Sequence, residues 1–451
     1  MKTNLKKSIF SLTISLVFLS VFISCSDKSE LERKLSRIEG ITEISKLDSD
    51  SLYSESYELW FTQNVDHENS KSESFKQRVI LNHVGFDRPT VVILEGYGIY
   101  SKKAGELSKL LNANQISIEH RFFNDSKPDT IEWEYLTIKQ AAIDQHKIIK
   151  ALKHLYSKKW ATTGISKGGQ TTMYHRRFFP NDVDASIVYV APFNFEREDP
   201  RISRHLKTAG TAKTREKIKN FQTMLFKMKD ELFPMLEVYA QEQEYTFNHV
   251  GMERAYDVNV LEYSFAFWQW NGDSSAIPDE KASNQEIFSH WSTTAPFSFF
   301  YDQDFSNDLV FTYQALSEIG FYEYDIEPFK KYLSDTANIT FDFKIPENIN
   351  YSYHPESMQD INSWLQENGN FMLYLYGEND PWAATAINPS PNTISVKFVN
   401  PNGNHRTRIK SFPDDVKENI YTLLENWMNV KIKRKEIAGG GSKPGKILEV
   451  L

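Results

Sequence analysis

A serine flanked by glycines is the feature of this sequence with the clearest chemical meaning. Ser166 lies between Gly164 and Gly168 in the pattern G-x-S-x-G. A strand-like stretch precedes it, and residues 168–179 have a helical pattern that stops at Pro180. A serine on a sharp turn between a strand and a helix is exposed at the edge of a sheet, where its hydroxyl can attack a carbonyl carbon. The pattern therefore predicts a nucleophilic serine that performs acyl transfer.

A serine hydroxyl needs a base that removes its proton, and a histidine oriented by a carboxylate normally does this. Asp380 and His405 each follow a strand-like run near the carboxyl end of the chain, and Glu378 is an alternative to Asp380. The order serine, acid, histidine is typical of α/β-hydrolases. We therefore predict a catalytic triad of Ser166, Asp380 and His405. The backbone N–H of Lys167, at the positive end of the predicted helix, is expected to stabilise the oxyanion.

The elements around these residues indicate an α/β fold. Short apolar runs alternate with helical patterns, as in a parallel sheet covered by helices. The predicted strands are residues 78–81, 90–95, 115–120, 159–164, 185–191, 371–376 and 394–399, and the predicted helices include 137–156 and 414–428. The fold class expected is an α/β-hydrolase sheet with an inserted helical cap.

The interval between Ser166 and Asp380 is far longer than one crossover connection requires. Residues 213–241 have helical spacing of apolar side chains, and aromatic residues crowd the segment that follows. We expect a helical cap at 201–365, between hydrolase core segments at 55–200 and 366–432. The aromatic residues either form the core of this cap or line an apolar substrate cleft beneath it.

The first residues have the composition of an export signal. Three lysines precede an apolar run that ends at Cys25, and residues 21–25 resemble the lipobox of bacterial lipoproteins. We expect a signal peptide over residues 1–24 and a lipid on Cys25, which would give an exported, membrane-anchored protein that faces the periplasm or the cell exterior. An ordinary cleaved signal peptide and an uncleaved anchor are the alternatives. Residues 25–54 are predicted to form a polar tether, and residues 433–451 a flexible tail.

The composition is that of a globular protein with a large core: 40% of the 451 residues are hydrophobic and 25% are charged. The net charge of -8 argues against nucleic acid as a partner. Cys25 is the only cysteine, so an internal disulfide is excluded.

Several segments, the serine motif among them, carry a family resemblance. They are residues 61–67 (FTQNVDH), 94–97 (LEGY), 119–123 (EHRFF), 164–169 (GISKGG), 189–192 (YVAP) and 380–382 (DPW). Together they resemble secreted bacterial tripeptidyl aminopeptidases, serine peptidases related to lysosomal prolyl-carboxypeptidase-like enzymes. The resemblance spans most of residues 55–430. It implies peptide substrates, no metal or other cofactor, and release of short peptides such as tripeptides from free amino termini.

The resemblance also suggests how substrates bind. A second oxyanion donor would come from Gly96 or Tyr97, and a carboxylate, Glu95 or Glu119, would bind the substrate's cationic amino group. A structural pairing of Glu119 with Arg121 is the alternative. The sequence lacks the cysteine pairs of the lysosomal relatives, and the number of residues released rests on the resemblance alone.

Two other functions remain open at this point. The same triad would serve a carboxylesterase or lipase, because esters are cleaved more readily than amides. A binding lipoprotein that kept the hydrolase scaffold without catalysis is the other alternative.

Overall fold

The computed structural model describes residues 28–434 apart from 304 and 337–338. The chain divides into two units, residues 1–37 and 38–451. In the first unit, helix α1 (Glu30–Leu35) begins after Ser29, whose hydroxyl accepts a hydrogen bond from the Glu32 N–H. Cys25, the predicted signal peptide and the tail from residue 435 onward lie outside the described residues.

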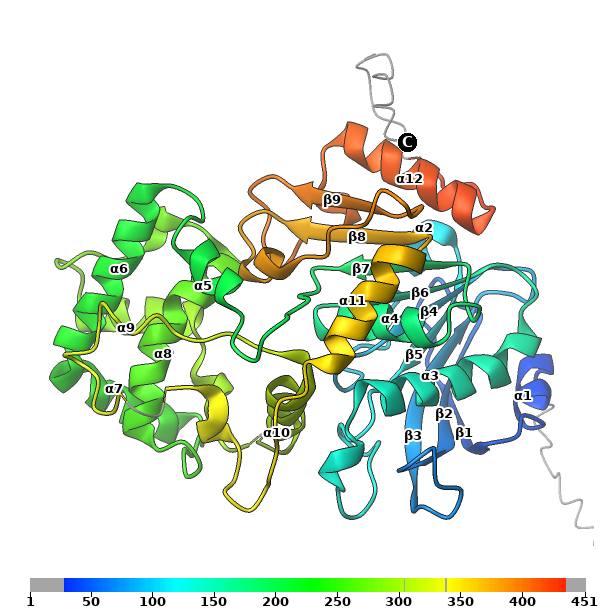
Figure 1. Ribbon diagram of the computed structural model, residues 1–451, viewed down its shortest axis with the longest axis horizontal. Coiled ribbons are helices and arrows are strands. Elements are labelled where there is room, and N and C mark those ends of the chain that lie inside the picture. Colours follow the sequence, from blue (N-terminus) through cyan, green and yellow to red (C-terminus); the bar gives the residue numbers. More distant parts are fainter. Residues whose placement is uncertain (1–27, 304, 337–338, 435–451) are drawn as a thin grey trace, which may run out of the picture. The chain divides into compact units, whose positions relative to one another are not determined.

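The second unit is built on a sheet that is nine-stranded within the described residues, in the order β1-β2-β3-β5-β4-β6-β7-β8-β9 (Figure 1). The strands are β1 (Ile41–Leu47), β2 (Glu55–Asn64), β3 (Ser74–His83), β4 (Thr90–Leu94), β5 (Asn114–Ile118), β6 (Trp160–Ile165), β7 (Ala185–Tyr189), β8 (Met372–Gly377) and β9 (Val396–Asn400). Pairing is antiparallel from β1 to β5 and parallel from β5 to β9. The carboxyl ends of β4 to β9 therefore meet at one edge.

Helices cover both faces of the sheet. Helices α2 (Glu106–Leu111) and α12 (Asp414–Met428) share a core with one face, and α3 (Ile138–Leu152), α4 (Lys167–Phe178) and α11 (Glu356–Asn368) share a core with the other. Neighbouring residues of β7 show the alternation of a strand: Ile187 belongs to the core of α12, and Val188 to that of α4. The continuous apolar sequence of these strands follows from burial on both faces.

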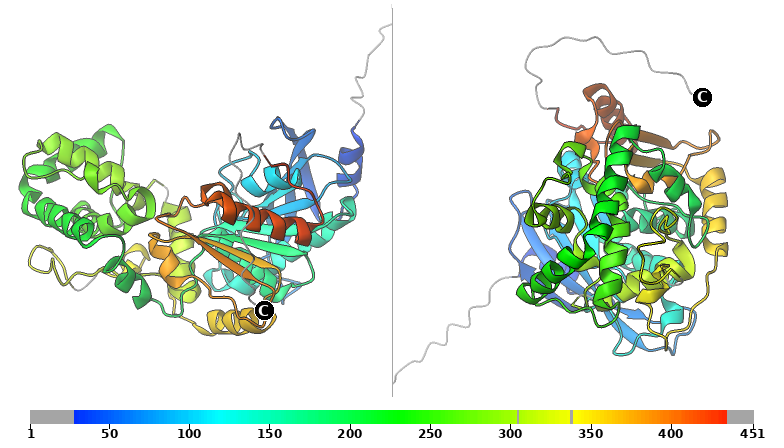
Figure 2. Two further views of the ribbon diagram at one scale, coloured as in Figure 1. Left: turned by 90° about the horizontal axis from the view of Figure 1, so that it is seen from above. Right: turned by 90° about the vertical axis from the view of Figure 1, so that its left-hand side faces the viewer.

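A helical insertion separates β7 from β8 along the chain. It contains α5 (Pro200–Leu206), α6 (Ala212–Lys227), α7 (Lys229–Glu242), α8 (Met252–Ala266), the π-helix η3 (Phe267–Asn271), α9 (Asn284–Thr294), α10 (Phe305–Gln314) and the π-helix η6 (Ala315–Ile319). Helices α6 to α9 pack together (Figure 2) around a core of their own that includes Trp291, Phe297 and Phe300. Most of the aromatic residues of the insertion are thus core residues, which was one of the two predicted roles.

Short 3₁₀ helices connect these elements. They are η1 (Trp133–Tyr135), η2 (Lys153–Leu155), η4 (Ser274–Ala276), η5 (Phe297–Phe299), η7 (Phe341–Lys344), η8 (Pro381–Thr385) and η9 (Ile409–Ser411). Of these, η8 follows β8 at the sheet edge that carries the candidate site.

The predicted strands and the predicted α/β fold with a helical cap are confirmed, and three details differ. The range 213–241 forms two helices, α6 and α7, and the first turn of α7 contains Asp230 and Glu231, acids that favour a helix amino terminus. The predicted tether includes α1 and the edge strand β1, whose side chains are mostly exposed and polar. The last helix of the predicted cap range, α11, packs with the sheet, where Asp360 binds Arg177 of α4.

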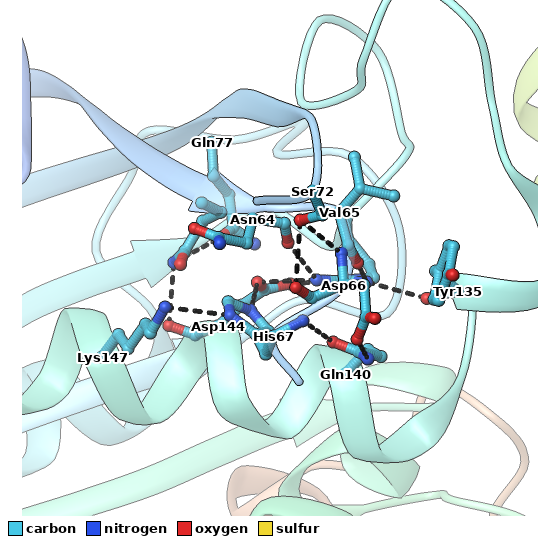
Figure 3. Close-up of polar contacts among 12 residues, drawn as sticks. Asn64, Val65, Asp66, His67, Ser72, Gln77, Tyr135, Gln140, Asp144 and Lys147 are labelled. Carbon is cyan, nitrogen blue, oxygen red and sulfur yellow. Dashed lines mark hydrogen bonds and ion pairs between the residues drawn. The ribbon is translucent and has the colours of Figure 1, made fainter. Parts of the chain in front are cut away.

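A buried polar network joins β2, the loop after β5 and helix α3 (Figure 3). Arg121 and Asp144 are both fully buried, and Arg121 Nε donates to Asp144 Oδ2 over 2.7 Å. His67 Nε2 contacts Asp144 Oδ1 over 2.6 Å, and Arg121 also binds the Val65 carbonyl. Burial alone would raise the pKa of Asp144, but Arg121 and His67 together hold it below its ordinary value. The segments 61–67 and 119–123 of the family resemblance thus meet in this network.

We expect Asp144→Asn to lower the free energy of unfolding by about 3–5 kcal/mol, because it leaves the Arg121 charge buried without a counter-ion. Urea titration at pH 7 measures this. Asp360→Asn, which breaks the more exposed pair with Arg177, is the control and should cost less than about 1 kcal/mol. The pKa of Asp144 is lowered in the folded protein. The difference in free energy of unfolding between the wild type and Asp144→Asn is therefore complete above the ordinary value of 3.8, and it shrinks as the pH falls below that value. Equal losses in the two variants would contradict the prediction.

Candidate active site

Ser166 occupies a strained turn between β6 and α4. Its backbone angles are φ 57° and ψ -125°, a combination that residues other than glycine rarely adopt. Its backbone N–H donates to the Tyr189 carbonyl over 2.9 Å. A Cβ atom on Gly164 would lie 2.1 Å from the Gly168 carbonyl oxygen, so glycine is required where strand and helix close on each other. The turn presents the partly buried serine at the carboxyl edge of the sheet.

Asp380 and His405 form a buried pair in two neighbouring loops of that edge. Asp380 follows β8, His405 follows β9, and His405 Nδ1 lies 2.7 Å from Asp380 Oδ2. The other carboxylate oxygen, Oδ1, accepts a hydrogen bond from the Trp382 N–H over 3.2 Å. The carboxylate therefore fixes the imidazole with its proton on Nδ1, which leaves Nε2 free to act as a base. The alternative acid, Glu378, instead binds the Asn402 N–H over 2.9 Å.

Parallel strands bring the three predicted triad residues to one edge, since Ser166 follows β6 and the pair follows β8 and β9. Within the described residues no hydrogen bond joins Ser166 to His405; catalytic hydrogen bonds often tighten only when substrate is present. The Ser166 side chain lies close enough to the Tyr97 hydroxyl to influence its pKa. Burial raises the pKa of the Tyr97 hydroxyl, and the neighbouring Ser166 side chain acts in the opposite direction.

The loop after β4 lies against the nucleophile turn. A Cβ atom on Gly96 would be 2.5 Å from the Lys167 carbonyl carbon and 2.6 Å from the Gly168 nitrogen, so only glycine permits this approach. Lys167 is the first residue of α4, where backbone N–H groups have no partner within the helix. The N–H groups of Lys167 and of the Gly96–Tyr97 segment, which lie against each other beside the nucleophile turn, therefore remain candidate oxyanion donors.

The two candidate amine-binding carboxylates differ in their surroundings. Glu119 is fully buried, and its oxygens already accept hydrogen bonds from the Ile99 N–H, Asn124 Nδ2 and Ser126 Oγ over 2.7–2.9 Å. It therefore supports the loops, and we do not carry it forward as an amine ligand. The alternative pairing of Glu119 with Arg121 is not formed either, because Arg121 binds Asp144.

Glu95 is the carboxylate that stays available. It directly follows β4 and is partly buried, and its carboxylate has no hydrogen-bond or ion-pair partner among the residues that the structure describes. Burial, together with the charge of Glu119, raises the pKa of Glu95 to about 7. A cationic group beside Glu95 would supply the positive counter-charge that its ionised carboxylate lacks among the described residues.

One contact of the site comes from the cap and could not be predicted from the sequence. The backbone N–H of His405 donates to the Gln269 carbonyl over 3.1 Å. The ring of Trp270 meets the His405 ring edge-on, with the ring centroids 5.2 Å apart. Asn404 Nδ2 also donates to the Trp270 carbonyl over 3.1 Å. The π-helix η3 thus holds the loop that carries the histidine. Aromatic crowding pointed to this segment, but not to the ring that meets His405.

Comparison with known proteins agrees with this geometry. Residues 29–444 match the family model described as PS-10 peptidase S37. The chain belongs to this family. It is 32% identical over 380 residues to the prolyl tri/tetrapeptidyl aminopeptidase of Streptomyces mobaraensis, which covers 82% of this chain and 80% of that protein. The S37 chain is therefore a serine peptidase, and the resemblance drawn from its motifs is confirmed.

More distant matches of the S37 chain are lower in identity. It is 26% identical over 219 residues to the probable serine protease EDA2 of Arabidopsis thaliana, covering 43% of this chain and 44% of that protein. Among solved structures, the proline iminopeptidase of Mycobacterium smegmatis aligns over 82% of this chain and 99% of its own, with 12% identity and a TM-score of 0.40.

Proposed function

We propose that this S37 peptidase releases tripeptides, or other short peptides, from the free amino termini of peptide substrates, through an acyl-enzyme on Ser166. The observation that carries the proposal is the buried Asp380–His405 pair at the sheet edge where the strained Ser166 lies. The name of the Streptomyces relative supports the peptide length.

In this mechanism His405 Nε2 accepts the Ser166 proton as the oxygen attacks the scissile carbonyl. Asp380 stabilises the imidazolium that forms. The Lys167 N–H and an N–H of the Gly96–Tyr97 segment bind the oxyanion. His405 then protonates the leaving amine, and water activated by the same histidine releases the short peptide.

Glu95 is proposed to bind the substrate's protonated α-amino group. The residue adjoins the loop that contributes to the oxyanion site, and its carboxylate has no partner within the described part of the chain. Charge-assisted hydrogen bonds from an ammonium group would satisfy it, and the Glu119 carboxylate nearby adds to the attraction. A site that holds the amine at a fixed distance from Ser166 sets the length of the released peptide.

The proposal is tested by digesting a defined peptide library with the wild type and reading product lengths by mass spectrometry. Peptides with free amino termini should lose fragments of one short length, and their N-acetylated counterparts should resist. Internal cleavage or hydrolysis of simple esters alone would contradict the proposal and favour the esterase alternative. Absence of labelling by a fluorophosphonate would favour the non-catalytic alternative.

A prediction for Glu95 follows from its raised pKa. We compare kcat/KM for a tripeptidyl anilide with that for its analogue lacking only the α-amino group. The wild-type preference for the amine should fall as the pH drops below about 7, because protonation removes the Glu95 charge. Glu95→Gln should reduce this preference about 10- to 100-fold at pH 8 and make it independent of Glu95 protonation.

The stability of the same variant gives an independent check. Because the folded pKa of Glu95 is raised above its ordinary value of 4.5, the wild type loses stability as the pH rises from 4.5 through about 7. Glu95→Gln should therefore melt at a higher temperature than the wild type at pH 8, and at a similar temperature at pH 4. An unchanged amine preference in this variant would contradict the role of Glu95.

For localisation, we propose an exported lipoprotein attached to a membrane through Cys25. The lipobox-like sequence at residues 21–25 supports this, although it lies outside the described residues. Among the helices that the structure describes, none has the length and apolar character needed to cross a bilayer. Incorporation of labelled palmitate that Cys25→Ser abolishes would support the anchor, and unlabelled wild-type protein would contradict it.

A further inference from the structure

We propose that the side-chain amine of Lys167 is a positioning group of the oxyanion site, which holds the Gly96 carbonyl so that the Tyr97 N–H faces the reacting oxygen. The inference rests on the proposed function, because it assigns a role within the reaction of Ser166. It goes beyond the backbone role of Lys167, since the side chain and the N–H of this residue would serve the same site in two ways.

The Lys167 side chain connects the nucleophile turn to the loop that faces it. Only 3% of the residue is exposed, and Nζ donates to the Gly96 carbonyl oxygen over 2.6 Å. The amine also lies over two aromatic rings, 5.6 Å from the centroid of Tyr97 and 5.1 Å from that of Phe123. One residue thus fixes the distance between both halves of the oxyanion site.

The hydrogen bond to the Gly96 carbonyl also determines the direction of the Tyr97 N–H, because both belong to the same planar peptide. In a trans peptide the carbonyl and the following N–H point in opposite directions, and the described residues contain no cis bond. The amine that holds the Gly96 carbonyl therefore directs the Tyr97 N–H away from Lys167 Nζ. The next carbonyl, that of Tyr97, accepts the His120 N–H over 3.0 Å, so both peptides that flank Tyr97 are fixed.

The backbone N–H of Tyr97, which this arrangement orients, has no hydrogen-bond acceptor among the described residues, although the carbonyls on either side are bonded. A backbone N–H held in place without a partner costs free energy unless water or a ligand satisfies it. A developing oxyanion at Ser166 is the acceptor that the proposed reaction supplies.

A purely structural role explains Lys167 less well. Burial lowers the pKa of its amine well below the ordinary value, and no carboxylate lies within ion-pair distance of it in the described part of the chain. An apolar side chain would fill the space without this desolvation cost. Lys344 offers the comparison: it is equally buried, and its Nζ donates to the Phe299 carbonyl over 2.6 Å, but Asp308 pairs with it over 2.9 Å.

The test compares Lys167→Met with Lys344→Met, using the full chain and a tripeptidyl anilide. In Lys167→Met we expect kcat to fall about 10- to 100-fold while KM changes less than about threefold, because the interaction matters only when the oxyanion forms. Inhibition constants for a tripeptide aldehyde, whose hemiacetal occupies the oxyanion site, should rise by the same factor. Those for the matching tripeptide alcohol should not change. Lys344→Met should affect thermal stability alone.

The ratio of the aldehyde and alcohol inhibition constants decides the outcome. A ratio that Lys167→Met leaves at the wild-type value would overturn the inference. If Lys167→Met does not fold, Lys167→Leu, which also removes the donor, is measured and the same ratio decides. Failure of the proposed function has a separate signature, namely full peptidase activity in Ser166→Ala.

Discussion

Ser166→Ala is expected to lower kcat for peptide hydrolysis by about 10⁴- to 10⁶-fold and to abolish labelling by a fluorophosphonate. The substitution removes the attacking oxygen and leaves the Asp380–His405 pair in place. Alanine also keeps the Cβ atom that serine already carries at φ 57°, so the turn should fold as before. Steady-state kinetics with a tripeptidyl anilide and thermal melting measure the two parts of this prediction.

A serine on the neighbouring strand provides the control. Ser186 is buried in β7, where its hydroxyl lies 2.9 Å from that of Thr162. Ser186→Ala should keep kcat within about threefold of the wild type while losing about 1 kcal/mol of stability. More than one-hundredth of wild-type activity in Ser166→Ala would show that another group is the nucleophile.

Asp380→Asn is expected to lower kcat by about 10⁴-fold with little change in KM. The amide has nearly the shape of the carboxylate, but its NH₂ group would donate toward Nδ1 and favour the tautomer with the proton on Nε2. His405 would then have no lone pair for the Ser166 proton. The lost charge would also leave the imidazolium without its counter-ion. A full kinetic comparison at pH 8 measures both constants.

The competing carboxylate is the matched control for this variant. Glu378 lies in the same loop after β8, and its side chain binds the Asn402 N–H rather than His405. Glu378→Gln keeps an acceptor for that N–H, so kcat should stay within about fivefold of the wild type. A larger loss in Glu378→Gln than in Asp380→Asn would assign the triad acid to Glu378.

Much of the fold could be predicted because strands buried on both faces have continuous apolar sequences. The apolar segments that form β4, β6, β7 and β8 could be recognised for this reason. The polar residues that follow β6 and β8 could then be predicted to be catalytic. The edge strand β1 has no such run, because one of its sides meets solvent, and its Ser, Thr, Glu and Lys residues are those of a linker.

The details of the site depend on contacts between distant segments, which local patterns do not record. Glu95 and Glu119 both flank apolar runs, yet only the folded chain brings Ser126 and Asn124 to the Glu119 oxygens. In the same way, nothing in the sequence around Lys167 indicates that its amine reaches the carbonyl of Gly96, in a loop on another strand.

The hydrogen bond from His405 to Gln269 gives the helical insertion a mechanical connection to proton transfer. His405, the proposed base, follows β9 on one side and is bound on the other by a segment that belongs to the insertion. A shift of that segment by about 1 Å is enough to misalign reacting groups. In the proposed mechanism, the position of the η3 segment therefore helps to set the position of His405 relative to Ser166.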